Sequence, residues 1–165
     1  MSAAYKRRFL LIKLVVFRQY LLKTSLPDRT YTCIRYVPKK GGFLVEVVFE
    51  VKQDVLIAHI KGELDHHNAA PIRNGIDRSM KAFECRDLIL DLEGVEFMDS
   101  SGIGIALGRY KKLSKSGGRI CISGCSAYIE KLLDMAGVFS IIPKEVDVQS
   151  ALCLLIGEEQ LYMEV

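Results

Sequence analysis

The chain has 165 residues, of which 50% are hydrophobic and 26% charged, and these proportions fit one globular domain and exclude a disordered, fibrous or collagen-like protein. The net charge of +3 conceals an asymmetry, because residues 1–44 carry ten basic side chains and one acidic, whereas residues 45–165 carry 13 basic and 19 acidic. The folded part is therefore acidic, so we expect no direct nucleic-acid binding.

Residues 1–44 form a basic N-terminal extension ahead of a domain predicted over 45–165. Its apolar run, residues 9–17, is interrupted by Lys13 and is about half the length of a membrane span, so we expect no membrane partner. Lys40-Gly41-Gly42 can be encoded as a purine-rich ribosome-binding sequence and Val45 as the alternative start codon GUG. We expect translation to begin at Val45, with a translated but disordered basic arm as the alternative, and the intact mass of the native protein distinguishes the two.

Strands and helices alternate from Val45 onward. Residues 45–52 and 55–62 predict two strands joined by a tight turn. The pattern then predicts a helix over 68–83, which starts near Asn68 because Pro71 is tolerated only in a first turn. A strand over 87–92, a loop over 93–104 and a helix over 105–113 follow. The remaining predicted elements are a strand over 119–123, a helix over 126–135 capped by Ser126, a strand over 139–142 and a helix over 147–156. The order indicates an α/β fold with a mixed, mainly parallel sheet and helices packed against it.

The five cysteines are odd in number and irregularly spaced, which favours a reducing cytoplasm over a disulfide framework. Cys121 and Cys125 are spaced as a metal-binding pair, but no second pair follows, so we expect small buried thiols rather than a zinc site. His59 lies inside a predicted strand and is interpreted as a packed or edge histidine. We expect no metal and no cofactor.

The segment Met98–Gly102 places an acid, two hydroxyls and a glycine where a loop leads into a helix. One interpretation is an N-cap, in which Asp and Ser accept the first free backbone N–H groups. The other is a phosphorylation site, because a helix N-terminus accommodates added negative charge without unfolding the domain. Phosphate there should change charge more than shape, with amide-exchange differences near residues 97–104 and little elsewhere.

The glycines at 102, 104 and 108 also suggest a dinucleotide-binding loop. Their spacing is one residue too long for that fingerprint, and no acid follows at the end of the next strand. We expect instead that Gly104 and Gly108, which share a helix face, allow close packing on the sheet.

Three blocks carry a family resemblance: Gly62–His67, the pair Leu92–Gly104 and Leu107–Lys111, and Leu132–Phe139. Together they closely resemble the anti-sigma factor antagonists of the STAS-domain family, in particular the sporulation antagonists of endospore-forming bacteria. The resemblance covers about residues 45–160 and implies a single STAS domain. Asn68 stands where the family often has a capping Thr, and residues 1–44 match nothing in the family.

The resemblance implies a cytoplasmic switch that is not an enzyme but the substrate of one. Ser100 is the implied phosphoacceptor, and Asp65, Asp99, Ser101 and Gly102 are the implied partner-binding residues, with a simple helix cap as the alternative for Asp65. The implied partners are an anti-sigma factor with serine kinase activity and a serine phosphatase. Unphosphorylated protein would free a sporulation sigma factor. The alternatives are a STAS scaffold of a stress-response circuit and a nucleotide-binding enzyme with Asp99 or Asp65 as catalytic acid.

Overall fold

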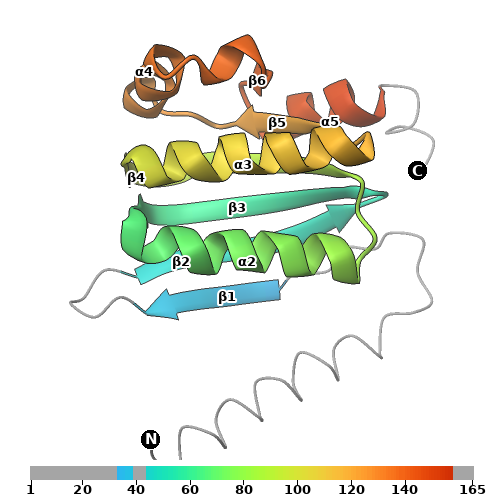
Figure 1. Ribbon diagram of the computed structural model, residues 1–165, viewed down its shortest axis with the longest axis horizontal. Coiled ribbons are helices and arrows are strands. Elements are labelled where there is room, and N and C mark those ends of the chain that lie inside the picture. Colours follow the sequence, from blue (N-terminus) through green and yellow to red (C-terminus); the bar gives the residue numbers. More distant parts are fainter. Residues whose placement is uncertain (1–32, 39–43, 158–165) are drawn as a thin grey trace, which may run out of the picture.

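The computed structural model describes residues 33–38 and 44–157, which form one six-stranded sheet with strand order β1-β2-β3-β4-β5-β6 (Figure 1). The first three strands pair antiparallel and the last four pair parallel. The strands are β1 (Cys33–Pro38), β2 (Leu44–Lys52), β3 (Val55–Leu64), β4 (Asp87–Met98), β5 (Ile120–Ser123) and β6 (Lys144–Glu145). The helices are α2 (His66–Ala82), α3 (Ser100–Ser116), α4 (Ala127–Met135) and α5 (Val148–Ile156), with a 3-10 turn η1 (Val138–Ser140).

The sheet separates two cores, because its strand residues alternate between the two faces. Leu56, Ala58 and Ile60 of β3 contribute to the larger core, together with apolar side chains of α2, α3 and α4. Val55 and Ile57 face the other way and pack with α5. This is the predicted α/β architecture, with helices on both faces of a mixed sheet. Among the residues that the structure describes, no helix combines the length and apolarity needed to cross a bilayer.

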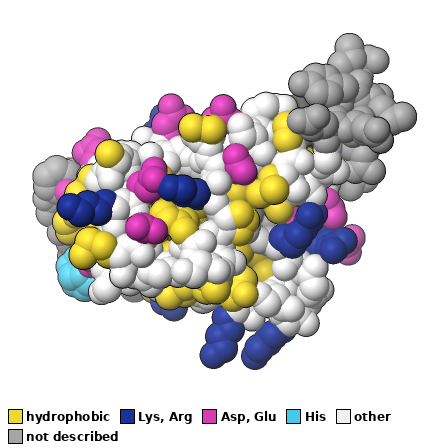
Figure 2. Space-filling model, turned by 90° about the horizontal axis from the view of Figure 1, so that it is seen from above, with side chains coloured by type: hydrophobic (Ala, Val, Ile, Leu, Met, Phe, Trp, Pro, Cys, Tyr) yellow, Lys and Arg dark blue, Asp and Glu magenta, His cyan; other side chains and the backbone are white. Residues whose placement is uncertain are grey.

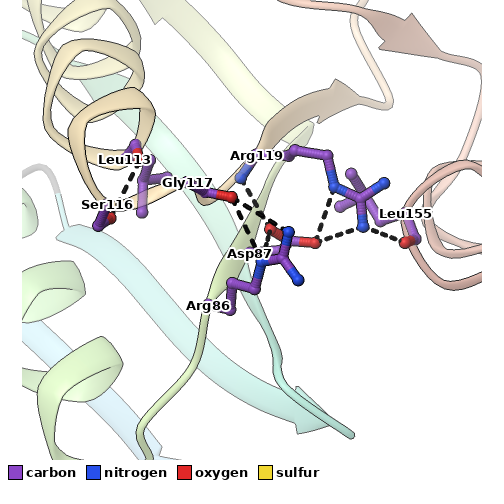
Figure 3. A network of polar contacts seen from close by, with 7 residues as sticks. All are labelled: Arg86, Asp87, Leu113, Ser116, Gly117, Arg119 and Leu155. Carbon is purple, nitrogen blue, oxygen red and sulfur yellow. Dashed lines mark hydrogen bonds and ion pairs between the residues drawn. The ribbon is translucent and has the colours of Figure 1, made fainter.

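A polar cluster joins the start of β4 to the start of β5 (Figure 3). The buried Asp87 carboxylate accepts hydrogen bonds from the Arg119 backbone N–H at 2.7 Å and from its guanidinium at 2.7 and 3.1 Å. Arg119 also donates to the carbonyl of Leu155 in α5, and Arg86 donates to the carbonyl of Gly117, which ends α3. The cluster therefore ties the ends of α3 and α5 to the sheet.

The predicted order of elements is confirmed except at the N-terminus and near residue 140, where the sequence interpretation was incomplete or wrong. β1 was not predicted; it lies in the basic extension, most of which is outside the described residues. The strand expected over 139–142 is wrong: η1 occupies 138–140 and the sixth strand is Lys144–Glu145. Gly137 has a left-handed backbone with φ 72° before η1, and the N–H groups of Ile141 and Ile142 donate to the Val138 carbonyl at 3.1 and 2.9 Å, so this segment is coiled and not extended.

Two element boundaries near the motif also differ from expectation. The loop expected over 93–104 is wrong, because β4 continues to Met98 and α3 begins at Ser100. The helix expected from Asn68 begins at His66 instead, so that Pro71 lies inside α2 rather than in its first turn. Both shifts bring the N-termini of α2 and α3 up to the ends of β3 and β4.

Candidate functional site

The N-termini of α2 and α3 lie at the same end of the molecule, where the parallel strands β3 and β4 end (Figure 1). The two helices pack side by side on one face of the sheet. Each begins after a single aspartate, Asp65 before α2 and Asp99 before α3. The segment Met98–Gly102 therefore lies beside the block Gly62–His67, and each leads into one of two adjoining helix starts.

Asp99 caps α3 and also contacts α2. Its Oδ1 accepts the backbone N–H of Ser101 at 2.6 Å, and its Oδ2 accepts the backbone N–H of His66 at 3.2 Å. Partial burial raises the pKa of this carboxyl, but the hydrogen bonds from Ser101 and His66 outweigh it and hold the pKa below its usual value. Asp99 is therefore ionised at neutral pH. The contact with His66 was not predicted, because nothing in the local sequence links residues 33 positions apart.

Ser100 is the first residue of α3 and is exposed. Ser101 is partly buried, and Gly102 is buried. A Cβ at Gly102 would lie 2.4 Å from Cγ of Met98 and 3.3 Å from Cβ of Leu64, so the first turn of α3 rests directly on the strand ends. Ser100 is thus the accessible hydroxyl of the motif, and Gly102 sets the path of the helix beneath it.

The expectation that Gly104 and Gly108 pack closely on the sheet is wrong. Gly104 is exposed and Gly108 is partly buried, and a Cβ at either position would meet nothing within 4 Å among the described residues. The close approach occurs one turn earlier, at Gly102.

Asp65, which the family resemblance implies as a partner-binding residue, is buried, with 7% of its surface exposed. Its Oδ1 accepts the backbone N–H groups of His67 at 3.0 Å and Asn68 at 3.1 Å. The buried Asn68 side chain donates in turn to the Glu63 carbonyl at 3.1 Å. The structure therefore places Asp65 as the N-cap of α2, the alternative that the sequence left open.

The face seen in Figure 2, on the side of α4, β6 and α5, shows hydrophobic side chains reaching the surface among charged ones. The exposed large hydrophobic side chains of the described residues are Phe97, Tyr128, Met135, Ile141, Val146 and Leu154. Phe97, which is 43% exposed, is two positions from Asp99 in the chain. It was not predicted as a site residue, because residues 93–98 were interpreted as a loop and not as an alternating strand.

The remaining candidate residues, His59, Cys121 and Cys125, lie in β3, in β5 and just after β5. His59 Nδ1 is 2.7 Å from Asp91 Oδ2 and its Nε2 is 3.4 Å from Glu50 Oε2, which fits the expected packed histidine. Cys121 is buried and Cys125 partly buried. Burial raises their thiol pKa values to about 12 and about 11. Within the described ranges, no three His, Cys, Asp or Glu side chains are grouped so that they could hold a metal ion.

Comparison with protein families matches residues 46–151 to the STAS domain. Among characterised proteins, the chain is 37% identical over 99 residues to the anti-sigma F factor antagonist of Paenibacillus polymyxa, covering 60% of this chain and 85% of that protein. It is 32% identical over 95 residues to the anti-sigma-B factor antagonist of Bacillus subtilis, covering 56% of this chain and 85% of that protein.

Among solved structures, the chain is similar to the anti-sigma factor antagonist SpoIIAA in its unphosphorylated form, with 28% identity and a TM-score of 0.57 over 70% of this chain and 97% of that one. It is also similar to the Bacillus cell fate determinant SpoIIAA in the phosphorylated form, with 27% identity and a TM-score of 0.50 over 67% of this chain and 96% of that one.

Proposed function

The chain belongs to the STAS-domain family, and from this premise we propose that it is an anti-sigma factor antagonist switched by phosphorylation of Ser100. The observation that carries the proposal is the exposed hydroxyl of Ser100 at the first position of α3, directly after the ionised Asp99. The relatives named above are antagonists of anti-sigma factors, and SpoIIAA has been solved in both an unphosphorylated and a phosphorylated form.

The proposed partner of the unphosphorylated protein is an anti-sigma factor that also acts as a serine kinase, and a serine phosphatase restores the starting state. Binding of the antagonist frees a sporulation sigma factor in the cytoplasm. The similarity to the anti-sigma F factor antagonist favours the sporulation circuit. The proposed docking surface consists of Ser100 and the two helix starts around it, with the exposed aromatic ring of Phe97 nearby in the chain. Exposed aromatic side chains are enriched among residues that dominate protein interfaces.

Phosphate at Ser100 would oppose docking for two physical reasons. It adds a charge of about −1.5 to −2 next to the Asp99 carboxylate. A partner surface fitted to a hydroxyl would then have to desolvate that charge without a matching cation. A difference of about 3 kcal/mol in binding free energy changes affinity by about a hundredfold, since each 1.4 kcal/mol is about tenfold. A penalty of that size would exchange partners without refolding the domain.

In this proposal, Ser101 and Asp99 contribute to the same surface. Gly102 acts from beneath it, because it is buried, and Asp65 acts by fixing the start of α2. The chain itself is not an enzyme. A nucleotide-binding enzyme would use Asp99 or Asp65 as a catalytic acid, but the low pKa of Asp99 and the use of Asp65 as a helix cap both oppose that role.

Phosphopeptide mapping tests the proposal. The purified chain is incubated with ATP, with and without the anti-sigma factor kinase. We expect label only when the kinase is present, on Ser100, and no label on Ser100→Ala. The matched control is Ser101→Ala, which retains the acceptor hydroxyl and should still be labelled on Ser100. Label on Ser101 with Ser100 unmodified would overturn the assignment, and labelling without added kinase would favour an enzyme.

A further inference from the structure

Asp99 makes three hydrogen bonds, with the end of β3, the start of α2 and the first turn of α3. Its backbone N–H donates to the carbonyl of Leu64 at 3.1 Å, at the end of β3. Its Oδ2 accepts the N–H of His66 at 3.2 Å, and its Oδ1 accepts the N–H of Ser101 at 2.6 Å. The Asp99 side chain, next to Ser100, therefore connects the starts of α2 and α3, which are far apart in the sequence.

The two carboxylate bonds differ in strength and setting. The bond to Ser101 is short and partly buried, and it lies within the first turn of α3. The bond to His66 is 0.6 Å longer and exposed, so it is the weaker of the two. The exposed His66 ring also lies near, with Nδ1 3.8 Å from the same Oδ2.

We propose that Asp99 transmits the phosphorylation state of Ser100 to the start of α2. The inference rests on the proposed function, because it takes Ser100 as the phosphoacceptor. A phosphate on Ser100 repels the neighbouring Asp99 carboxylate, and the longer bond to His66 is lost before the shorter bond to Ser101. Phosphorylation then alters the docking surface at both helix starts and not only at residues 97–104.

Asp99 is a positioning residue in this account, and its effect can be separated from helix capping. The N–H groups of His67 and Asn68 belong to the same first turn of α2, but they bond to Asp65 and not to Asp99. Loss of the Asp99 contact should therefore affect His66 and leave these two neighbours unchanged. General loosening of α2 would affect all three.

Residue-resolved amide exchange tests the proposal on full-length chain in which phosphoserine is incorporated at position 100 during synthesis. No kinase or partner is used, so the outcome is independent of the labelling experiment above. Failure of that labelling experiment would instead refute the proposed phosphorylation of Ser100 by a kinase partner. We expect exchange of the His66 amide to accelerate about tenfold on phosphorylation, as loss of one hydrogen bond implies. The amides of His67 and Asn68 should keep their rates.

Two variants complete the test. Asp99→Asn keeps an acceptor oxygen and removes the charge, so phosphoserine should accelerate His66 exchange much less than in the wild type. Asp99→Ala removes the acceptor, so His66 should exchange fast with or without phosphate. An unchanged His66 rate in the phosphorylated wild type would overturn the proposal. Equal acceleration at His66, His67 and Asn68 would overturn it as well.

Discussion

Replacing Asp65 by Ala tests whether this residue acts as a structural cap or as a docking contact. The substitution removes the acceptor of two backbone hydrogen bonds, from His67 and Asn68, at a position that is 7% exposed. Loss of an N-cap costs about 0.5–2 kcal/mol. We expect about 1–2 kcal/mol, because the part-buried N–H of His67 loses its acceptor, whereas the N–H of Asn68 keeps a bond to the Asp65 carbonyl at 3.1 Å.

Two matched variants set the scale. Asp65→Asn keeps an oxygen acceptor, and we expect it to lose less than about 1 kcal/mol. Asp147 caps α5 through one bond to the Ser150 N–H at 2.7 Å and is exposed, so Asp147→Ala should lower the free energy of unfolding less than Asp65→Ala does. Urea denaturation followed by circular dichroism gives the free energy of unfolding of each protein. If Asp65→Ala unfolds within about 0.5 kcal/mol of the wild type while losing the anti-sigma factor, the cap assignment is refuted.

Three further predictions concern the rest of the domain. Gly104→Ala and Gly108→Ala should each raise the free energy of unfolding by about 0.5–1 kcal/mol, because alanine favours the helix and its Cβ would meet no described atom within 4 Å. Gly102→Ala should lower the free energy of unfolding. A loss of stability at Gly104 or Gly108 in urea denaturation would contradict this. The hydrogen bond with Asp91 raises the pKa of His59 above 6.5, so the protonated imidazole stabilises the fold below that pH and this contribution is lost as pH rises through the raised pKa. The difference in unfolding free energy between wild type and His59→Gln should therefore narrow as the pH rises from below 6.5 through the raised pKa of His59, and a difference independent of pH would refute this assignment. Asp87→Ala should lower the free energy of unfolding by about 2–3 kcal/mol, because it leaves the donors of Arg119 without their buried acceptor. Arg86→Ala, at the exposed side of the same cluster, should lower it by less than about 1 kcal/mol. Equal losses of stability on thermal unfolding would contradict the assignment of Asp87 as the buried centre of the cluster.

Hydrophobic periodicity was sufficient to predict the parallel part of the fold, since β3, β4 and β5 are apolar runs separated by helices. It failed where a long-range contact decides the structure. The second half of β4 contains charged residues and Gly94, which are typical of a loop. It is a strand because it pairs with the end of β3, where a Cβ at Gly94 would lie 2.3 Å from Cγ of Lys61. A glycine required by close strand approach cannot be distinguished from a loop glycine in one sequence.

The candidate site was predicted only in part, because long-range contacts also decide its structure. The sequence of Asp99 and Ser100 indicated a helix start, and the structure places an N-cap and an exposed hydroxyl there. Asp65 was implied as a partner-binding residue with a helix cap as the alternative, and the structure shows its buried carboxylate capping α2. The bond between Asp99 and His66 depends on the adjacent ends of β3 and β4, so it could not be predicted before the topology was known.

The affinity of the chain for its anti-sigma factor, measured by calorimetry with and without phosphoserine at position 100, tests the central claim most directly. We expect tight binding of the unphosphorylated chain and of Ser100→Ala, and binding weaker by about a hundredfold or more when Ser100 carries phosphate. Phosphoserine placed at position 101 instead is the control for added charge at a neighbouring, partly buried hydroxyl. Equal affinity of the unphosphorylated and Ser100-phosphorylated chains would contradict the account.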